Sequence, residues 1–362
     1  MKIFFIALPL LYLLLNGYLY WRVSLMMHSL PLSLKILFGL LFWTLTIALF
    51  VVIILRGAAL PQPLSRALFN LGSTWLLLSF YLVIALTLFD TLRLFIELPA
   101  HPFWFALPLT IVTMIYGYIN YRNPKVERIE IECDGEFEPL KLVAVSDIHL
   151  GYGTTKSDMK RYAELINREG ADVVVIAGDL IDNSLRPITD NRMEEELSML
   201  KAEKGIYMVA GNHEYISGIE ACCDFLKKTP IVLLRDSIVN LDCGVQIIGR
   251  DDRVNRRRKS LEELYSHCDT TRPTILLDHQ PYNLSKTDSL GITLQISGHT
   301  HHGQVWPLNT LTNYIYEQSH GYRAWQRSHI WVSSGLSLWG PKFRIGTRGD
   351  IAVITIKPRN RE

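Results

Sequence analysis

The sequence contains few charged residues and almost no excess of charge of either sign. Charged residues make up 20% of the 362 positions, and the formal net charge is +2. Binding to a polyanion usually requires a strongly basic domain or a basic stripe along one face. We therefore expect no nucleic-acid partner for this chain.

Cysteine is also scarce, and its five occurrences lack metal-binding spacing. They are odd in number and form no zinc-type pair: Cys133, Cys222, Cys223, Cys243 and Cys268. Structural disulfides belong to oxidising compartments, where cysteines are usually paired. We expect reduced thiols in the cytosol.

Charge is absent from four long apolar stretches near the N-terminus. They cover residues 3–21, 36–55, 72–89 and 103–120, each close to the roughly 20 residues that a helix needs to cross a bilayer. Trp and Tyr cluster at several of their ends, as is typical of membrane interfaces. A buried four-helix core is the alternative, but such helices should show polar faces at helical spacing. A signal peptide is disfavoured because no small-residue cleavage site follows the first stretch. We expect a transmembrane region of four helices over residues 1–121.

The basic residues between these stretches predict their orientation. Six lie on the side of the N-terminus and three on the opposite side, namely Lys2, Arg56, Arg66, Arg122, Lys125 and Arg128 against Arg22, Lys35 and Arg93. Lys and Arg accumulate in cytoplasmic loops. We therefore expect an integral membrane protein of the bacterial inner membrane, with everything after residue 121 in the cytoplasm.

Residues 122–362 have the pattern of an α/β domain. Apolar runs such as "LKLVAVSD", "ADVVVIAGD" and "IYMVAGN" alternate with helical segments that end at glycine, such as "DMKRYAELINREG". Strands that alternate with helices predict a layered α/β fold. The short junction "YRNPKVER" is expected to keep this domain close to the bilayer.

Five of the predicted strands end in side chains that can bind metals. The groups at these ends are Asp147 and His149; Asp179 and Asp182; Asn212, His213 and Glu214; Asp278 and His279; and His299 and His301. In open α/β sheets, ligands bind at the carboxyl ends of the strands. One such residue is usually an ordinary loop residue, but five strand ends together indicate a shared site. Mixed oxygen and imidazole donors suit two divalent ions that share a carboxylate.

These motifs resemble those of the calcineurin-like metallophosphoesterases. "DIH", "GDLID", "GNHE", His279 and "GHTH" occur in this order, and the resemblance covers about residues 127–362. It implies an αββα sandwich with a site for two divalent metal ions. The donor set suits Mn, Fe or Zn and does not choose among them.

The resemblance also implies a role for each residue of these motifs. The implied ligands of one metal are Asp147, His149, Asp179 and His301, and those of the second are the bridging Asp179, Asn212, His279 and His299. His213 would stabilise the transition state or protonate the leaving oxygen, and Glu214 would orient its ring. Asp182 would orient a ligand by a hydrogen bond, and Asp278 would have this role or a solvated or capping one.

Three further features bear on the substrate. His302 stands where close members of the family have glycine, and it either points into solvent or contacts the substrate. The basic segment "GRDDRVNRRRKS" with Arg250 and Arg253 is either a solvated loop or a contact for anionic headgroups or a substrate phosphate. The aromatic segment Asn313–Trp331 either belongs to the core of the domain and the rim of the site or forms a wall that contacts a lipid tail.

A last departure from the family lies near the C-terminus. Gly349-Asp350-Ile351 replaces the Pro-Glu-Ile that membrane-associated members often carry. We expect this difference to matter little to the metals.

The sequence thus predicts a membrane-anchored enzyme that hydrolyses a phosphoester or pyrophosphate bond with a hydroxide activated by two metals. The membrane tether favours a lipid-linked substrate, and some members of the family cleave the pyrophosphate of UDP-2,3-diacylglucosamine. A phosphodiesterase or phosphatase acting on a soluble substrate is the first alternative. An inactive membrane sensor or scaffold should lack a ligand, whereas every ligand position is filled here. A transporter should carry ionisable residues within its spans, whereas the four apolar stretches contain no charged residue.

Overall fold

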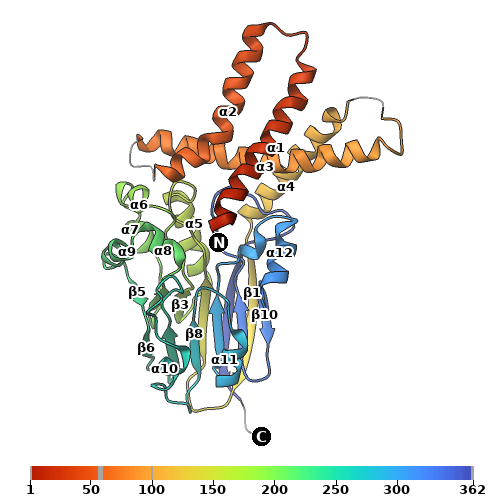
Figure 1. Cartoon of the computed structure of the whole chain (residues 1–362). Helices are drawn as coiled ribbons and strands as arrows, with labels where there is room; N and C mark the ends of the chain where they lie inside the picture. The colour runs from red at the N-terminus through yellow and green to blue at the C-terminus, as the bar shows by residue number, and fades with distance from the viewer. Residues whose placement is uncertain (1, 56–59, 99–100, 360–362) are drawn as a thin grey trace. The chain divides into compact units, whose positions relative to one another are not determined.

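The computed structural model describes residues 2–55, 60–98 and 101–359. Contacts within the chain divide it into two compact units, Met1–Tyr118 with Gly340–Lys342, and Ile119–Trp339 with Phe343–Glu362. Figure 1 follows the chain from the red helices of the first unit to the blue strands of the second.

The first unit is built from four helices, α1 (Lys2–Met26), α2 (Leu32–Ile54), α3 (Gln62–Leu92) and most of α4 (Phe103–Arg122). Among the described residues, α2, α3 and α4 are long and apolar enough to cross a membrane, and they contain the expected spans apart from residue 55. Three of the four expected spans are thus found among the described residues. A helix also forms over residues 3–21 within α1, but the first side chains of this stretch lie outside the described residues. Arg56, which entered the orientation count, lies outside the described residues.

The polar side chains of α1 find partners within the first unit. Asn16 is fully buried, and its Oδ1 accepts a hydrogen bond from Trp75 Nε1 in α3 at 3.1 Å. Arg22 forms an ion pair with Asp90 of α3 and also donates to Tyr18. A buried polar group is costly unless it is paired, so these contacts hold α1 against its neighbours.

The second unit contains two six-stranded sheets. The first has the order β1-β12-β2-β3-β4-β5, with β1 (Lys125–Cys133), β2 (Leu140–Val145), β3 (Val173–Ile176), β4 (Ile206–Val209), β5 (Ile231–Leu234) and β12 (Asp350–Pro358). The second has the order β10-β11-β9-β8-β7-β6, with β6 (Ser237–Asn240), β7 (Gln246–Gly249), β8 (Thr274–Leu277), β9 (Leu294–Ser297), β10 (Gly321–Ala324) and β11 (His329–Val332). Strands β2 to β5 are parallel, as are β7, β8, β9 and β11. Runs such as "VVVI" in β3 are buried on both faces, as is typical of parallel strands.

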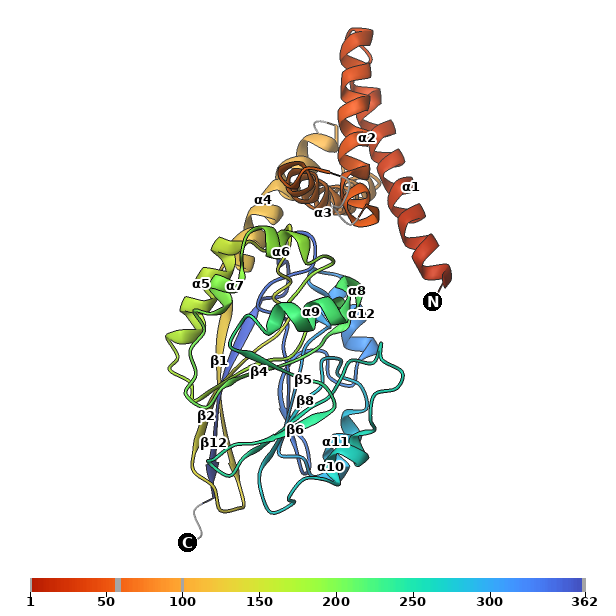
Figure 2. The ribbon, with the colours of Figure 1, turned by 90° about the vertical axis from the view of Figure 1, so that its left-hand side faces the viewer.

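The two sheets pack face to face, and helices cover their outer faces. Apolar residues of both inner faces, such as Leu142, Val175, Ile247 and Ile275, form one buried cluster. The outer face of the first sheet packs against α5 (Lys156–Asn167) and α9 (Ile219–Leu226), and that of the second against α10 (Leu261–Tyr265) and α11 (Leu284–Leu290). The other described helices of this unit are α6 (Arg186–Asp190), α7 (Glu194–Leu197), α8 (Asn212–Ser217), η1 (His301–Gly303) and α12 (Leu308–Ile315). The α/β expectation is confirmed, and Figure 2 shows the two sheets side by side.

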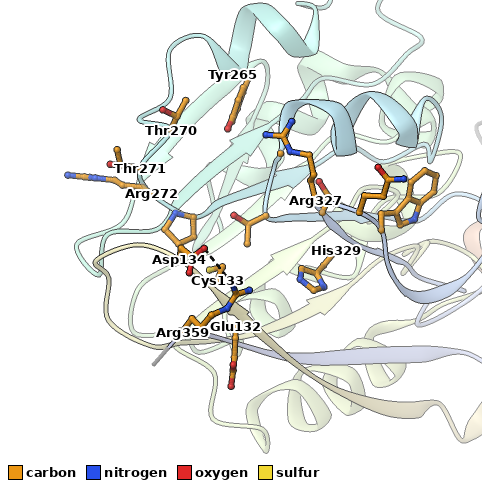
Figure 3. A pocket seen from close by; sticks show the side chains of 16 residues that line it. Glu132, Cys133, Asp134, Tyr265, Thr270, Thr271, Arg272, Arg327, His329 and Arg359 are labelled. Atoms are coloured by element: carbon orange, nitrogen blue, oxygen red, sulfur yellow. Dashed lines mark ion pairs between the residues drawn. The ribbon is translucent and has the colours of Figure 1, made fainter. Parts of the chain in front are cut away.

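A pocket of about 340 Å³ lies where β8, β9 and β11 begin. Figure 3 shows that its wall includes the guanidinium groups of Arg272, Arg327 and Arg359, with Asp134 paired to Arg359 at 3.6 Å. The described residues contain three groups of side chains that could hold a metal, and none of them lines this pocket. The predicted metal ligands lie instead where the strands end.

Candidate metal centre

The seven predicted ligands lie together at the carboxyl ends of strands from both sheets. Within the described residues, six of these ligands and His213 form three groups whose donor atoms lie within 4.8 Å of one another, namely Asp147, His149 and His301; His149, Asp179 and His213; and Asp179, His279 and His299. Asp179 and His149 each belong to two of these groups, so the groups are continuous with one another. The second group also contains His213, for which the sequence predicts a catalytic role rather than a ligand role.

The first half of the centre is formed by His149, His301 and Asp147. The Nε2 atoms of the two histidines face each other at 3.1 Å. Asp147 Oδ1 lies 3.5 Å from His301 Nε2 and 3.8 Å from His149 Nε2. Two imidazole nitrogens and a carboxylate oxygen thus point toward one small volume, which is the donor arrangement that a divalent cation requires.

The second half of the centre is formed by His279, His299 and Asn212. Asn212 Oδ1 lies 2.9 Å from His299 Nδ1 and 3.3 Å from His279 Nε2. His279 Nδ1 lies 2.7 Å from the carbonyl oxygen of Ala177, and a carbonyl only accepts, so Nδ1 must carry a proton. This bond fixes the ring and directs Nε2 into the centre, as is common for histidines that bind metals.

Asp179 connects the two halves. Its Oδ2 lies 3.7 Å from His149 Nε2 and 3.2 Å from His279 Nε2, so one carboxylate oxygen faces a nitrogen of each half. Its Oδ1 accepts a hydrogen bond from the backbone N–H of His213 at 2.9 Å. The donors present therefore fit two divalent cations that share the carboxylate of Asp179.

The backbone at these ligands is strained. Ten described non-glycine residues have positive φ, and five of them are predicted ligands, namely Asp147, His149, Asp179, His299 and His301. Such conformations cost about 1–3 kcal/mol each and concentrate at functional sites. The tight turns after the strands direct the ligand side chains toward one centre, and the strained backbone lowers the stability of the fold.

Two glycines of the motifs are required by close approach. A Cβ on Gly298 would lie 1.9 Å from Ser146 Oγ and 2.3 Å from Asp147 Oδ2. A Cβ on Gly211 would lie 2.1 Å from Asp179 Oδ1. Any side chain at either position would displace a predicted ligand, which explains the glycine in "GHTH" and "GNHE" physically.

The carboxylates and histidines strongly perturb one another. Burial raises the pKa of Asp179, but the charges of His279 and His213 outweigh it and hold this pKa well below its usual range. Burial lowers the pKa of His149, but its contacts with Asp147 and Asp182 raise it to about 10. The carboxylates of the centre thus raise the pKa of His149, and its histidines lower the pKa of Asp179.

His213 and Glu214 differ from each other in their surroundings. Asp182 Oδ1 lies 3.2 Å from His213 Nδ1 and 3.6 Å from His149 Nδ1, so Asp182 can orient both rings. The expectation that Glu214 orients His213 is wrong. The buried Glu214 carboxylate instead accepts backbone N–H groups from Gly211, Asp179 and Ile181, at 2.7, 3.1 and 2.9 Å. Because α8 begins at Asn212, Glu214 occupies the helix position that folds back on the preceding turn.

Asp278 and the predicted substrate contact Arg250 form an ion pair beside the centre. Asp278 binds Arg250 at 3.0 Å and Arg258 at 3.1 Å, with all three side chains largely buried. The solvated or capping role considered for Asp278 is therefore replaced by pairing with two arginines. This pairing fixes the start of the basic segment against the strand end that leads to His279.

Arg253 and His302 lie among aromatic rings at the rim. The Arg253 guanidinium lies 4.0 Å from the Tyr282 ring centre, and Tyr282 hydrogen-bonds to Tyr316 at 3.3 Å. His302 is half-buried and stacks on His320 with ring centres 3.4 Å apart, so its ring does not simply point into solvent. Contact of Arg253 or His302 with substrate stays a prediction.

Arg344 is a positioning residue that the sequence did not indicate. It is fully buried, and its guanidinium donates to the carbonyl oxygens of His301, Gly335 and Ser337 at 2.8, 2.9 and 2.9 Å, and to that of Ser334. Burial lowers its pKa to about 10. Arg344 thus fixes the turn after β11 against a predicted ligand.

Asp350 provides a pH-dependent contact behind this turn. Its buried carboxylate accepts hydrogen bonds from Ser333 Oγ at 2.6 Å and Ser334 N at 2.9 Å, and burial raises its pKa to about 6. The folded pKa lies above the unfolded value of about 3.9, so the contribution of Asp350 to stability is greatest below pH 4 and decreases by roughly 3 kcal/mol as pH rises through 6. Asn keeps an acceptor oxygen without this ionisation.

We therefore expect Asp350→Asn to gain thermal stability relative to the unmodified chain between pH 4 and 7. The unfolding temperature of Asp350→Asn minus that of the unmodified chain should increase by roughly 5–10 °C from pH 4 to pH 7, as measured by tryptophan fluorescence in detergent. Asp134→Asn, at an exposed carboxylate, is the matched control and should produce no such change. Parallel curves for Asp350→Asn and the unmodified chain would contradict the assignment.

Comparison with known proteins places this geometry in a family. The family model described as calcineurin-like phosphoesterase matches residues 140–303. A metallophosphoesterase of Helicobacter pylori is 32% identical over 249 residues, which are 67% of this chain and 66% of the relative. One from Campylobacter jejuni is 31% identical over 275 residues, which are 74% of this chain and 71% of the relative.

Two further proteins are similar to this chain. A Danio rerio transmembrane protein with metallophosphoesterase domain is 31% identical over 272 residues, which are 70% of this chain and 62% of that protein. The solved structure of a 5'-nucleotidase precursor from Thermus thermophilus has a TM-score of 0.37 at 15% identity, covering 60% of this chain and 55% of that one, and is too dissimilar to bear on function. The motifs, their convergence and the sequence relatives agree, and the chain belongs to the calcineurin-like metallophosphoesterase family.

Proposed function

We propose that this protein is a membrane-anchored hydrolase that cleaves a phosphoester or pyrophosphate bond of a lipid-linked substrate at a two-metal centre. The observation that carries the proposal is the position of Asp179, whose Oδ2 faces His149 and His279 at 3.7 and 3.2 Å. An inactive scaffold would be expected to lack at least one ligand, whereas every predicted ligand is present here.

The residues that would hold the metals fall into two sets. One cation would be held by Asp147, His149, Asp179 and His301, and the other by Asp179, Asn212, His279 and His299. When bound, two such cations lower the pKa of water and neutralise charge that develops on phosphoryl oxygens. Mn, Fe and Zn all suit these ligands.

His213 supplies the proton that the leaving oxygen needs. Asp182 Oδ1 lies 3.2 Å from Nδ1 of this ring, which leaves Nε2 on the side away from Asp182 and available to a substrate. The His213 side chain remains 13% exposed, whereas that of His149 is only 1% exposed. A histidine that is fixed at one nitrogen and accessible at the other is suited to general acid catalysis.

The membrane anchor supports a lipid-linked substrate. Three helices are long and apolar enough to span a bilayer, and only Asn123 and Pro124 separate α4 from β1. The distribution of basic residues supports a cytoplasmic catalytic domain at a bacterial inner membrane. A nucleotide-linked diacylglucosamine pyrophosphate is one substrate with the required chemistry.

The test compares the unmodified full chain with Asp179→Asn, both loaded with manganese in detergent. Each is mixed with bacterial membrane lipids and UDP-2,3-diacylglucosamine, and phosphorus NMR records which phosphate signals disappear. We expect loss of a lipid-linked signal with the unmodified chain only. If only an aryl phosphodiester is hydrolysed, the lipid-linked substrate is wrong, and if nothing is hydrolysed, the hydrolase assignment is wrong.

A further inference from the structure

Helix α12 exposes an apolar face on the second unit. None of its eight residues is buried, and Leu308, Leu311, Tyr314 and Ile315 are 45%, 53%, 89% and 53% exposed. Leu308, Leu311 and Ile315 recur at the spacing that places side chains on one face of a helix. Single exposed apolar residues are common on protein surfaces, but a contiguous apolar face usually marks an interaction site.

This face begins at the candidate metal centre. α12 follows η1, which contains His301, and a Cβ on Gly303 would lie only 2.5 Å from Asn309 N, so helix and turn are in close contact. After α12, the Tyr316 ring lies 6.4 Å from the ring of His299. The helix therefore lies between two segments that line the centre.

The chain also enters the second unit at this edge of the sheets. Within that unit, Asn120 near the end of α4 donates to the carbonyl oxygen of Arg344 at 3.3 Å, and the Arg344 guanidinium donates to that of His301 at 2.8 Å. Lys125, the first residue of β1, donates its N–H to Gly349 at 2.8 Å. Figure 1 shows α12 at the end of the second unit where β1 begins.

Basic side chains accompany this edge. The side chain of Arg122 is 42% exposed beside Asp158, and the exposed Arg348 donates to the carbonyl oxygen of Asn123 at 2.7 Å. Both lie within two residues of the α4–β1 junction or contact it. Apolar side chains beside exposed arginines suit a surface of anionic lipid, into which rings and aliphatic chains enter while guanidinium groups meet phosphates.

We propose that the apolar face of α12 lies in the bilayer surface and holds the metal centre against it, so that a lipid-linked phosphate reaches the centre without leaving the membrane. The delivery of substrate rests on the proposed function, whereas the docking of α12 does not. The committed partner is the bilayer surface, because the chain enters this edge directly from α4, which is long and apolar enough to cross a membrane.

The docking is tested by photo-crosslinking, which needs no catalytic activity. The full chain carrying p-benzoylphenylalanine in place of Tyr314 is reconstituted in vesicles of phosphatidylethanolamine and phosphatidylglycerol, and adducts are identified by mass spectrometry. Val232 on β5, 48% exposed, receives the same probe as the control. We expect at least tenfold more lipid adduct at position 314. Equal yields at both positions, or a crosslink from position 314 to a second copy of the chain, would overturn the proposal.

The consequence for substrate is tested with the double variant Leu311→Glu and Tyr314→Glu. We expect at least a tenfold rise in KM for a vesicle-borne phosphate ester, with unchanged hydrolysis of a soluble aryl phosphodiester. Val232→Glu should change neither. Equal losses in both assays would show that α12 acts by holding His301, and no loss in either would show that docking does not deliver substrate. If the unmodified chain hydrolyses neither substrate, the proposed function fails, while the crosslinking result still decides the docking.

Discussion

Replacing Asp179 with Asn is expected to lower phosphoester hydrolysis at least about 100-fold and to reduce the bound metal from two ions per chain to at most one. The Asp179 Oδ2 atom faces His149 Nε2 at 3.7 Å and His279 Nε2 at 3.2 Å, so it is the donor that both halves of the centre share. Changes to residues that only support a ligand cost roughly 10–100-fold. Loss of a shared anionic ligand should exceed this range.

Asn is the informative replacement because it preserves the local hydrogen bond. Asp179 Oδ1 accepts from His213 N at 2.9 Å, and an amide oxygen can accept the same bond. The change therefore removes the charge of the carboxylate with little effect on the turn, which circular dichroism can verify. A loss of activity is then attributable to the metals rather than to the fold.

Metal content is measured by elemental analysis of the desalted protein, beside turnover of an aryl phosphodiester. Asp134→Asn is the matched control, because the Asp134 carboxylate is exposed and, within the described part of the chain, forms an ion pair only with Arg359. It should retain both metals and full activity. If Asp179→Asn also retained two metals and full turnover, the shared-ligand assignment would be abandoned.

The convergence of the predicted ligands could be foreseen because each of them closely follows an apolar strand. β3 is the apolar run Val173–Ile176, and Asp179 follows three residues later. β9 is the run Leu294–Ser297, and His299 follows two residues later. Parallel neighbouring strands end at one edge, so sequence order alone places these donors near one another.

The roles of Glu214 and Arg344 were not predictable because they depend on local and long-range geometry. Glu214 follows His213 directly, but successive helical side chains point about 100° apart, so Glu214 turns back toward Gly211. Arg344 acts only because the segment after β11 returns to the centre, bringing its guanidinium to the carbonyl oxygen of His301. Neither contact has a sequence spacing that identifies it.

Helix α1 shows a related limit of what a sequence can predict. An apolar average over residues 3–21 conceals the partners that its polar residue requires. Asn16 is fully buried against Trp75, and Arg22 just beyond pairs with Asp90. A helix can thus be apolar in composition and still depend on neighbouring helices for its polar side chains.

Replacing His213 with Gln is expected to lower kcat by roughly 10²–10⁴-fold while the protein retains its metals. Asp182 Oδ1 lies 3.2 Å from His213 Nδ1, and this contact leaves Nε2 as the nitrogen that can donate to a leaving oxygen. Gln can still form hydrogen bonds at this position, but its amide does not transfer a proton at neutral pH. The loss should therefore appear in kcat rather than in KM.

How the loss of activity in His213→Gln depends on the leaving group distinguishes a role of His213 in proton donation from a role in metal binding. A substrate that releases an acidic phenol needs little protonation, so His213→Gln should impair it much less than an alkyl ester of the same phosphate. His213 also lies in a group with His149 and Asp179 whose donor atoms could hold a cation. If the variant lost one metal and impaired both substrates equally, His213 would be a ligand of the centre and not its acid. Retained metals with a loss confined to poor leaving groups would assign the proton to His213.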